Sequence, residues 1–411
     1  MVVASVPKDV RLVTDRIKSL YDKRLSYRFY CFMISYFLLS QRSVSKFSLS
    51  ASYSVSPSWF GRQIKRCPPN RLLRRIRKSL LKKIKETDDA ARFVFAIDDT
   101  ANPKYGKNMT GVALWGSSGG VYKGQKIFAV VVVDLKTKKA YPVAYRIQEK
   151  ESDETGIDIA ANLISDLVGS GFPPLVVVAD SWFCSTKLMS SLTDLGCEFV
   201  CQTKSNRKVK ANPSPNVLWT TLIEVFKGSQ RQRVCTDWDN PKILSRKRKR
   251  KIISERVLKI RCYKSPVKII AAYNRRGAKK PFAYYISTSR TRSGAMIWLL
   301  ARARWKIECV FRTCKQNFSF GKLSCSGREA SHLAVEMPFF LYCLLSLEPE
   351  KFCFTDSESV DAMARKIRQR ITDQTIELLI ERPDSAAVIE LRQKRSLERS
   401  RSLGGEVAAN S

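Results

Sequence analysis

Histidine is nearly absent from this sequence of 411 residues. The single histidine, His332, lies in the segment Glu329-Ala-Ser-His-Leu-Ala334. A lone histidine of this kind is more often a satisfied helix residue than a general base or a metal ligand. A histidine-centred triad or a zinc hydrolase site therefore has little support. The chemistry of this chain must depend mainly on carboxylates.

Closely spaced cysteine pairs of the zinc-binding kind are also missing. The sequence has 12 cysteines, but they are scattered, and the closest pairs are Cys197 with Cys201 and Cys309 with Cys314. Zinc knuckles need Cys-x2-Cys or a similar short spacing. We therefore expect reduced cysteines that act as small apolar core residues.

Long apolar runs are lacking too. A membrane span needs ~20 predominantly apolar residues, and the longest candidate run that we identify, 29–39, is about half that length. The first residues do not show the basic and then apolar order of a signal peptide. The sequence thus predicts no membrane association and a cytoplasmic location.

Acidic residues are few relative to basic ones. The sequence has 74 Lys and Arg but only 37 Asp and Glu, which gives a formal net charge of +37. A cation excess of this size attracts polyanions and makes binding strongly dependent on salt. Nucleic acid is the expected partner, and a basic protein of the membrane surface is the disfavoured alternative.

Residues 1–92 carry 21 Lys and Arg against 6 Asp and Glu, and we interpret them as an all-helical, DNA-binding N-terminal domain. A short helix near 43–48, a polar turn over 51–56 and a helix over 57–66 resemble a helix-turn-helix, because proline suits the first turn of a helix. An ordinary basic helical hairpin is the alternative. The stretch 71–85 carries apolar residues at helical spacing among its cations and predicts a basic amphipathic helix.

From residue 93 the pattern becomes an alternation of strands and helices typical of an α/β fold. A Gly-rich loop is expected over 106–124. The predicted strands and helices are, in chain order, strands 93–98, 127–134 and 140–147, a helix after Ser152, strand 175–180, helix 185–195 and strand 199–203. This is the element order of the ribonuclease-H-like fold, a mixed sheet flanked by helices. In that fold the first and fourth strands are neighbours.

The catalytic domain is expected to cover 93–350 and to contain a β-rich insertion at about 205–290. The insertion precedes the last catalytic helix and includes strands near 256–262, 268–273 and 281–287. The basic run 245–251 within it is either a DNA contact or a solvated loop. Residues 351–411 predict a charged helical C-terminal region with a disordered tail.

Three acids in this α/β pattern are candidates for one metal site. Asp98 and Asp180 end apolar, strand-like runs, and Glu308 lies in a predicted helix. On a helix, Arg304, Glu308 and Lys315 fall within roughly 40° of one another, so one face carries a carboxylate between two cations. The alternatives without a metal site are a capping role for Asp180 and an intrahelical ion pair for Glu308.

The spacing Arg304-x3-Glu308-x6-Lys315 resembles the Tyr-x2-Arg-x3-Glu-x6-Lys (YREK) signature of bacterial insertion-sequence transposases of the DDE type, the group around insertion sequence family 4. The tyrosine position is Ala301 in this chain. Two further segments, Ile97-Asp98-Asp99-Thr100 and Ala179-Asp180-Ser181-Trp182-Phe183, add to the resemblance. Adjacent residues of a strand point to opposite faces, and the family pattern Asp-x-Thr selects Asp98, with Asp99 as a turn residue.

The resemblance implies a DNA transposase that nicks transposon ends and transfers the strand by a cut-and-paste route. Asp98, Asp180 and Glu308 would hold two Mg²⁺ or Mn²⁺ ions, because carboxylate oxygens suit these ions. Arg304, Arg312 and Lys315 would bind DNA. The partners would be terminal inverted repeats, target DNA and a second subunit in a synaptic homodimer associated with the nucleoid. A nuclease without strand transfer and an inactive, DNA-binding descendant are the alternatives.

The hairpin step known in this family requires a flipped base stacked on an aromatic ring. Tyr284, Tyr285 and Trp298 are candidate platforms, although core positions are the simpler interpretation for all three.

Overall fold

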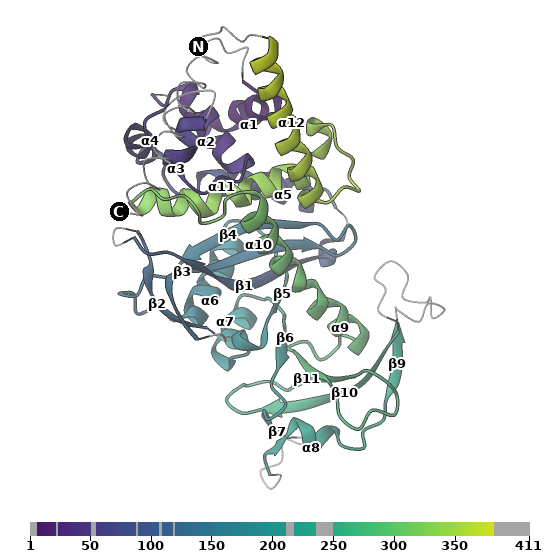
Figure 1. Cartoon of the computed structure of the whole chain (residues 1–411). Helices are drawn as coiled ribbons and strands as arrows, with labels where there is room; N and C mark the ends of the chain where they lie inside the picture. Colours follow the sequence, from purple (N-terminus) through teal and green to yellow (C-terminus); the bar gives the residue numbers. More distant parts are fainter. Residues whose placement is uncertain are drawn as a thin grey trace, which may run out of the picture. The chain divides into compact units, whose positions relative to one another are not determined.

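Two groups of segments form separate units in the computed structural model (Figure 1). The first comprises Met1–Ile76, Asn102–Gln125 and Phe311–Ser411, and the second comprises Arg77–Ala101 and Lys126–Val310. The structure describes residues 6–21, 24–50, 55–87, 89–106, 109–117, 120–210, 218–235 and 250–381. The proposed domain boundaries at 92 and 350 stay predictions.

The first unit is mainly helical, and the expected N-terminal helices are present. Its helices are α1 (Lys8–Ile17), α2 (Tyr27–Leu38), α3 (Val44–Ser50), α4 (Pro57–Ile64), the start of α5 (Arg71–Lys85), the end of α10 (Trp305–Asn317), α11 (Arg328–Leu347) and α12 (Val360–Glu381). The hydroxyl of Ser56 accepts the backbone N–H of Trp59 at the start of α4. The ring of Phe32 in α2 packs against Phe47 and Phe60 and joins α2, α3 and α4 in one core.

Helix α11 corrects the expectation that no apolar segment reaches the length of a membrane span. By length and composition it qualifies, with a mean hydropathy of 1.4 over an 18-residue window, but 89% of that window is buried inside the fold. Glu336 within it is only 1% exposed. Its carboxylate accepts the backbone N–H groups of Asn70 and Leu73 at 2.9 and 3.0 Å, and so caps the start of α5. Tertiary packing thus accounts for the apolar composition.

The Gly-rich segment 106–124 is not simply a loop, and that prediction is wrong for most of its length. Strand β2 (Val112–Ser117) pairs antiparallel with the first residues of β3 (Gly120–Asp134) as a hairpin. The side-chain indole of Trp115 donates to the carbonyl of Gly124 at 2.9 Å. Glycine at position 124 also permits the close approach of residues 102–103, because a Cβ there would lie 2.4 Å from the carbonyl oxygen of Asn102.

The second unit contains a mixed sheet with the predicted central neighbours. Strand β4 (Ala140–Ile147) pairs with β3, and the order continues through β1 (Phe93–Pro103), β5 (Val176–Ala179) and β6 (Phe199–Thr203). The β3–β4 hairpin is antiparallel, whereas β1 with β5 and β5 with β6 are parallel. The first and fourth predicted strands are therefore neighbours, as expected.

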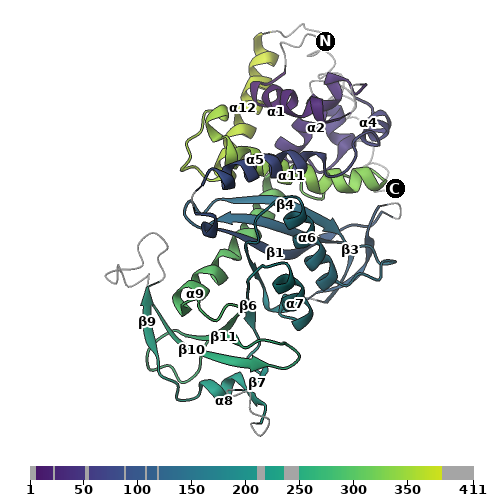
Figure 2. The ribbon, with the colours of Figure 1, turned by 180° about the vertical axis from the view of Figure 1, so that it is seen from behind.

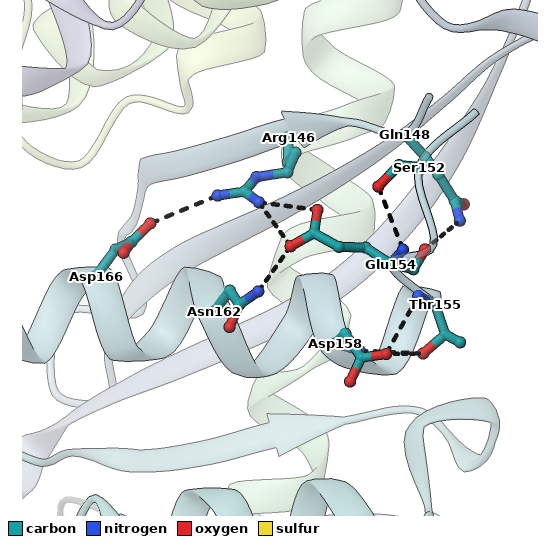
Figure 3. A network of polar contacts seen from close by, with 8 residues as sticks. All are labelled: Arg146, Gln148, Ser152, Glu154, Thr155, Asp158, Asn162 and Asp166. Carbon is teal, nitrogen blue, oxygen red and sulfur yellow. Dashed lines mark hydrogen bonds and ion pairs between the residues drawn. The ribbon is translucent and has the colours of Figure 1, made fainter. Parts of the chain in front are cut away.

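The helices of this unit begin at clear capping signals. Helix α6 (Gly156–Gly169) starts with a capping box between Thr155 and Asp158. Figure 3 shows how Arg146 of β4 holds the loop before the helix, because its Nη1 donates to both carboxylate oxygens of Glu154 at 3.1 Å. Helix α7 (Thr186–Asp194) lies beside α6 on one face of the sheet (Figure 2).

The segment predicted as an insertion contains β-strands that extend the same sheet. Strand β12 (Ala283–Ser287) pairs antiparallel with β6, and β11 (Val267–Tyr273) and β10 (Arg250–Ile260) follow. The remaining elements of this part are β7 (Lys208–Lys210), β8 (Thr220–Thr221), α8 (Leu222–Phe226), β9 (Gln232–Cys235) and α9 (Gly294–Ala303). Most of the basic run 245–251 and the whole C-terminal tail lie outside the described residues.

Candidate active site

Asp98 and Asp180 lie level with each other on neighbouring parallel strands. Val94 pairs with Val176 and Ala96 with Val178, so the same register sets Asp98 beside Asp180. Paired residues of parallel strands point to the same face, and the strands are ~4.8 Å apart. Asp180 directly follows β5 and makes no capping hydrogen bond to the 3-10 turn η4 (Ser181–Phe183). The capping interpretation of Asp180 therefore has no support in the structure.

The expectation that the first strand ends at Asp98 is wrong, because β1 continues to Pro103. Asp99 is consequently a strand residue and not a turn residue. Its carboxylate lies 3.8 Å from the Nζ of Lys126. The strand tolerates these polar residues because they are only partly buried, whereas residues 93–97 are fully buried.

Arg304 joins Asp98 to Glu308. Its Nη1 donates to Asp98 Oδ2 at 3.0 Å, and its Nη2 lies 2.5 Å from Glu308 Oε1. The two carboxylates come from segments more than 200 positions apart in the sequence. The predicted single helix is in fact two helices, because α9 ends at Ala303 and α10 begins at Trp305, with Arg304 at the junction. The alternative predicted for Glu308, an ion pair with Arg304, is thus present.

Negative charge accumulates at this site. Burial raises the pKa of Asp98 to about 7, Arg304 and the backbone N–H of Asp99 lower it, and the charges of Asp99 and Asp180 raise it further. The pKa of Asp99 is also raised, first by burial and then by Asp180, while Lys126 opposes the change. Burial is the larger cause of both shifts, and the proximity of the acids to one another adds to it. Such a site attracts cations.

The arrangement fits divalent cations in donor type but contains no preformed cage. Among the residues that the structure describes, no group of three or more Asp, Glu, His or Cys is spaced to hold a metal ion. The guanidinium of Arg304 lies between Asp98 and Glu308 instead. The sharing of two ions by Asp98, Asp180 and Glu308 therefore stays a prediction.

The other residues predicted to contact DNA differ in how far they are exposed. Arg312 and Lys315 belong to the part of α10 that groups with the first unit, where Arg312 is exposed and burial lowers the pKa of Lys315. Of the aromatic candidates, Tyr284 and Trp298 are core residues. Tyr285 packs edge-on against Trp298 with ring centroids 5.4 Å apart.

Sequence reasoning missed Lys126 and Trp182. The Nζ of Lys126 lies 4.5 Å from the centroid of the Trp182 ring and also faces Asp99. Lys126 is one of 74 cationic residues and no local pattern marks it. For Trp182 a signal existed, because an aromatic residue follows Asp180 after a single serine.

The sheet and its helices define an α/β protein. Its candidate site is a group of carboxylates, with Asp98 and Glu308 joined by Arg304 and Asp180 level with Asp98, in a chain of net charge +37. The chain belongs to the Transposase DDE domain family, which it matches over residues 66–344. It is therefore a DDE-type transposase by family, and such transposases generally use divalent metal ions. No curated protein matches the sequence.

Solved structures show weaker likenesses at 12% identity. The piggyBac transposase synaptic complex with hairpin DNA has a TM-score of 0.42 and covers 96% of this chain and 81% of that one. Human ENDOV has a TM-score of 0.29, with 60% of this chain and 98% of that one covered. The Drosophila P element transposase strand transfer complex has a TM-score of 0.19, with 95% of this chain and 91% of that one covered.

Proposed function

We propose that this chain is a cut-and-paste DNA transposase whose Asp98, Asp180 and Glu308 form a metal-binding catalytic triad. The observation that carries this proposal is the joining of Asp98 and Glu308 by one guanidinium, with Asp180 level with Asp98 in the sheet. These contacts support the proposal, because the three acids are distant in sequence and the chain is a protein of the DDE family. The strand order supports a ribonuclease-H-like fold for this unit.

The donor set suits Mg²⁺ or Mn²⁺, since all of its ligands would be hard carboxylate oxygens. When bound, two such ions would supply positive charge for the attacking and leaving oxygens of a phosphoryl transfer. Asp98, Asp180 and Glu308 would hold the ions. Burial raises the pKa of Asp98 and the charges of Asp99 and Asp180 raise it further, and a bound cation would oppose both effects. Arg304 would exchange its carboxylate partners for a DNA phosphate.

The finer assignment follows the resemblance described above. The chain would belong to the group around insertion sequence family 4, with Arg304, Glu308 and Lys315 in its helix signature and Ala301 in place of tyrosine. Arg304, Arg312 and Lys315 would contact phosphates near the cut. Residues 1–92 would recognise the terminal repeats, and two copies would act as a synaptic homodimer at the nucleoid in the cytoplasm.

A Glu308→Gln variant tests the triad, because glutamine keeps the size of the side chain and removes the ligand charge. We expect unchanged binding to transposon-end DNA and loss of Mg²⁺-dependent nicking. Glu151→Gln, at an exposed carboxylate of the same unit, is the matched control and should nick normally. Gel shift and cleavage assays on the same preparations separate the two effects. Nicking by Glu308→Gln at the control rate would refute the triad.

The same assay distinguishes the alternatives. A strand-transfer substrate that is nicked but never joined would indicate a nuclease. Specific binding without nicking under any Mg²⁺ or Mn²⁺ condition would indicate an inactive, DNA-binding descendant. Joined products are the outcome expected of a transposase.

A further inference from the structure

Two cysteines of the second unit have side chains that interact with each other. Cys184 directly follows the turn η4, and Cys201 lies in β6, where its register partner in β5 is Ala179. Both are free thiols, and hydrogen bonding to Cys201 is the largest cause that lowers the pKa of Cys184. Apolar core cysteines need no polar partner. This pair therefore differs from the cysteines that the sequence predicts.

Arg207 adds a positive charge at the sulfur of Cys184. Its Nη1 lies 2.8 Å from that sulfur, 2.9 Å from the backbone carbonyl oxygen of Cys184 and 3.4 Å from the hydroxyl of Thr203. A guanidinium keeps its charge in a protein, and it binds an anion more strongly than a neutral group. The contacts therefore favour the thiolate form of Cys184.

The two thiols differ in access and in protonation. Cys184 is half-buried, and its pKa is lowered to about 7 although burial opposes the change. Cys201 is completely buried, and burial raises its pKa well above the ordinary value. Near neutral pH, Cys184 is thus about half thiolate while Cys201 keeps its proton. In such a pair one sulfur can attack an oxidant and the other can resolve the product.

We propose that Cys184 and Cys201 form a modification site that a hydroperoxide oxidises to a disulfide. The Cys184 thiolate attacks one oxygen of the hydroperoxide, so that an S–O bond forms, the O–O bond breaks and the departing oxyanion takes a proton from solvent. The sulfur of Cys201 then attacks the Cys184 sulfenic acid. The S–S bond forms, the S–O bond breaks, and hydroxide leaves with the proton of Cys201 as water. Two thiols are oxidised and one hydroperoxide is reduced.

The test treats the reduced full-length protein with hydrogen peroxide at pH 7 and then alkylates the remaining thiols. Peptide mass spectrometry without reductant should find Cys184 linked to Cys201, and dithiothreitol should reverse the link. Fragmentation of the linked peptides distinguishes Cys201 from Cys197, four positions before it. Cys262 is exposed and is the internal reference, because it would react first if access alone decided the reaction.

The expected rates follow from the thiolate fraction. At pH 7 a thiol with a pKa of ~8.5 is about 3% ionised, and the higher nucleophilicity of its thiolate recovers about fivefold of the difference from Cys184. Cys184 should therefore oxidise at least about threefold faster than Cys262. Arg207→Ala should remove up to about threefold of the Cys184 rate, for the same reason. The matched control is Arg231→Ala, whose guanidinium lies over the ring of Tyr273, and it should oxidise as wild type does.

Two further variants separate the roles of the sulfurs. Cys201→Ser should stop at the sulfenic acid of Cys184, which dimedone labels, and Cys184→Ser should leave Cys201 reduced. Oxidation of Cys262 ahead of Cys184, or a wild-type disulfide from Cys184 to another cysteine, would overturn the proposal. Wild type that accumulates the Cys184 sulfenic acid without a disulfide would also overturn it. The readout needs neither DNA nor metal, so its outcome is independent of the proposed function.

Discussion

Replacing Asp98 by asparagine should stabilise the metal-free protein at alkaline pH. The raised pKa of Asp98, about 7 against an ordinary 3.8, means that the folded state holds the proton more tightly than the unfolded state. The stabilisation is complete below pH 3.8 and is lost as the pH rises toward 7. At 1.36 kcal/mol per pH unit, ionised Asp98 costs the fold up to about 4 kcal/mol at pH 8. Asparagine mimics the protonated form and avoids this cost.

The assay is chemical denaturation of wild type and Asp98→Asn in EDTA between pH 4 and pH 8. The free energy of unfolding of Asp98→Asn should exceed that of wild type by an amount that grows as the pH rises. This difference should vanish near pH 4. Added Mg²⁺ should stabilise wild type more than the variant, because binding to the native state adds to stability. Asp98→Asn less stable than wild type at pH 8 in EDTA would refute the reasoning.

Asp134 provides a control of opposite sign in the same unit. It is fully buried and accepts two contacts from Arg92, at 3.0 and 2.5 Å. Although burial opposes the change, these bonds lower the pKa of Asp134. Its stabilisation is present above pH 3.8 and is lost as the pH falls. Asp134→Asn should therefore cost about 3–5 kcal/mol near pH 7 and less in acid.

Three further predictions concern other features of the fold. Hydrogen bonding to Cys201 and the charge of Arg207, whose Nη1 lies 2.8 Å from the Cys184 sulfur, lower the pKa of Cys184 to about 7. Alkylation of Cys184 followed by mass spectrometry should show a midpoint near pH 7, and Arg207→Ala should raise it. Glu336→Ala should cost about 3 kcal/mol in thermal or chemical unfolding, because it removes the acceptor of two N–H groups at the start of α5, and that of Leu73 is buried; an unchanged melting temperature would contradict the cap. Gly156→Ala should destabilise by about 1–3 kcal/mol despite the better helix propensity of alanine, because its Cβ meets packed rings, and a gain in stability would show that the rings move aside.

Local elements were predictable because their causes are local. Helix α5, helix α7, strand β6 and the β3–β4 hairpin lie where apolar spacing and turn residues indicated them. The three motifs around Asp98, Asp180 and Glu308, together with the element order and the charge imbalance, also indicated the DDE family, which the match over residues 66–344 confirms. In each case the information is contained within a few neighbouring positions or in the composition.

Other features depend on partners distant in the chain, and the sequence alone did not determine them. Strand β1 passes through Asp98 and Asp99 because pairing continues beyond the apolar run. Helix α11 can be long and mainly apolar because 89% of its most apolar window is buried inside the fold. The link from Asp98 to Glu308 through Arg304, and the placing of Lys126 on Trp182, require strands and helices to meet in three dimensions. Periodicity assigns a residue to a face of its own element, but only tertiary packing decides which residue of another element lies opposite.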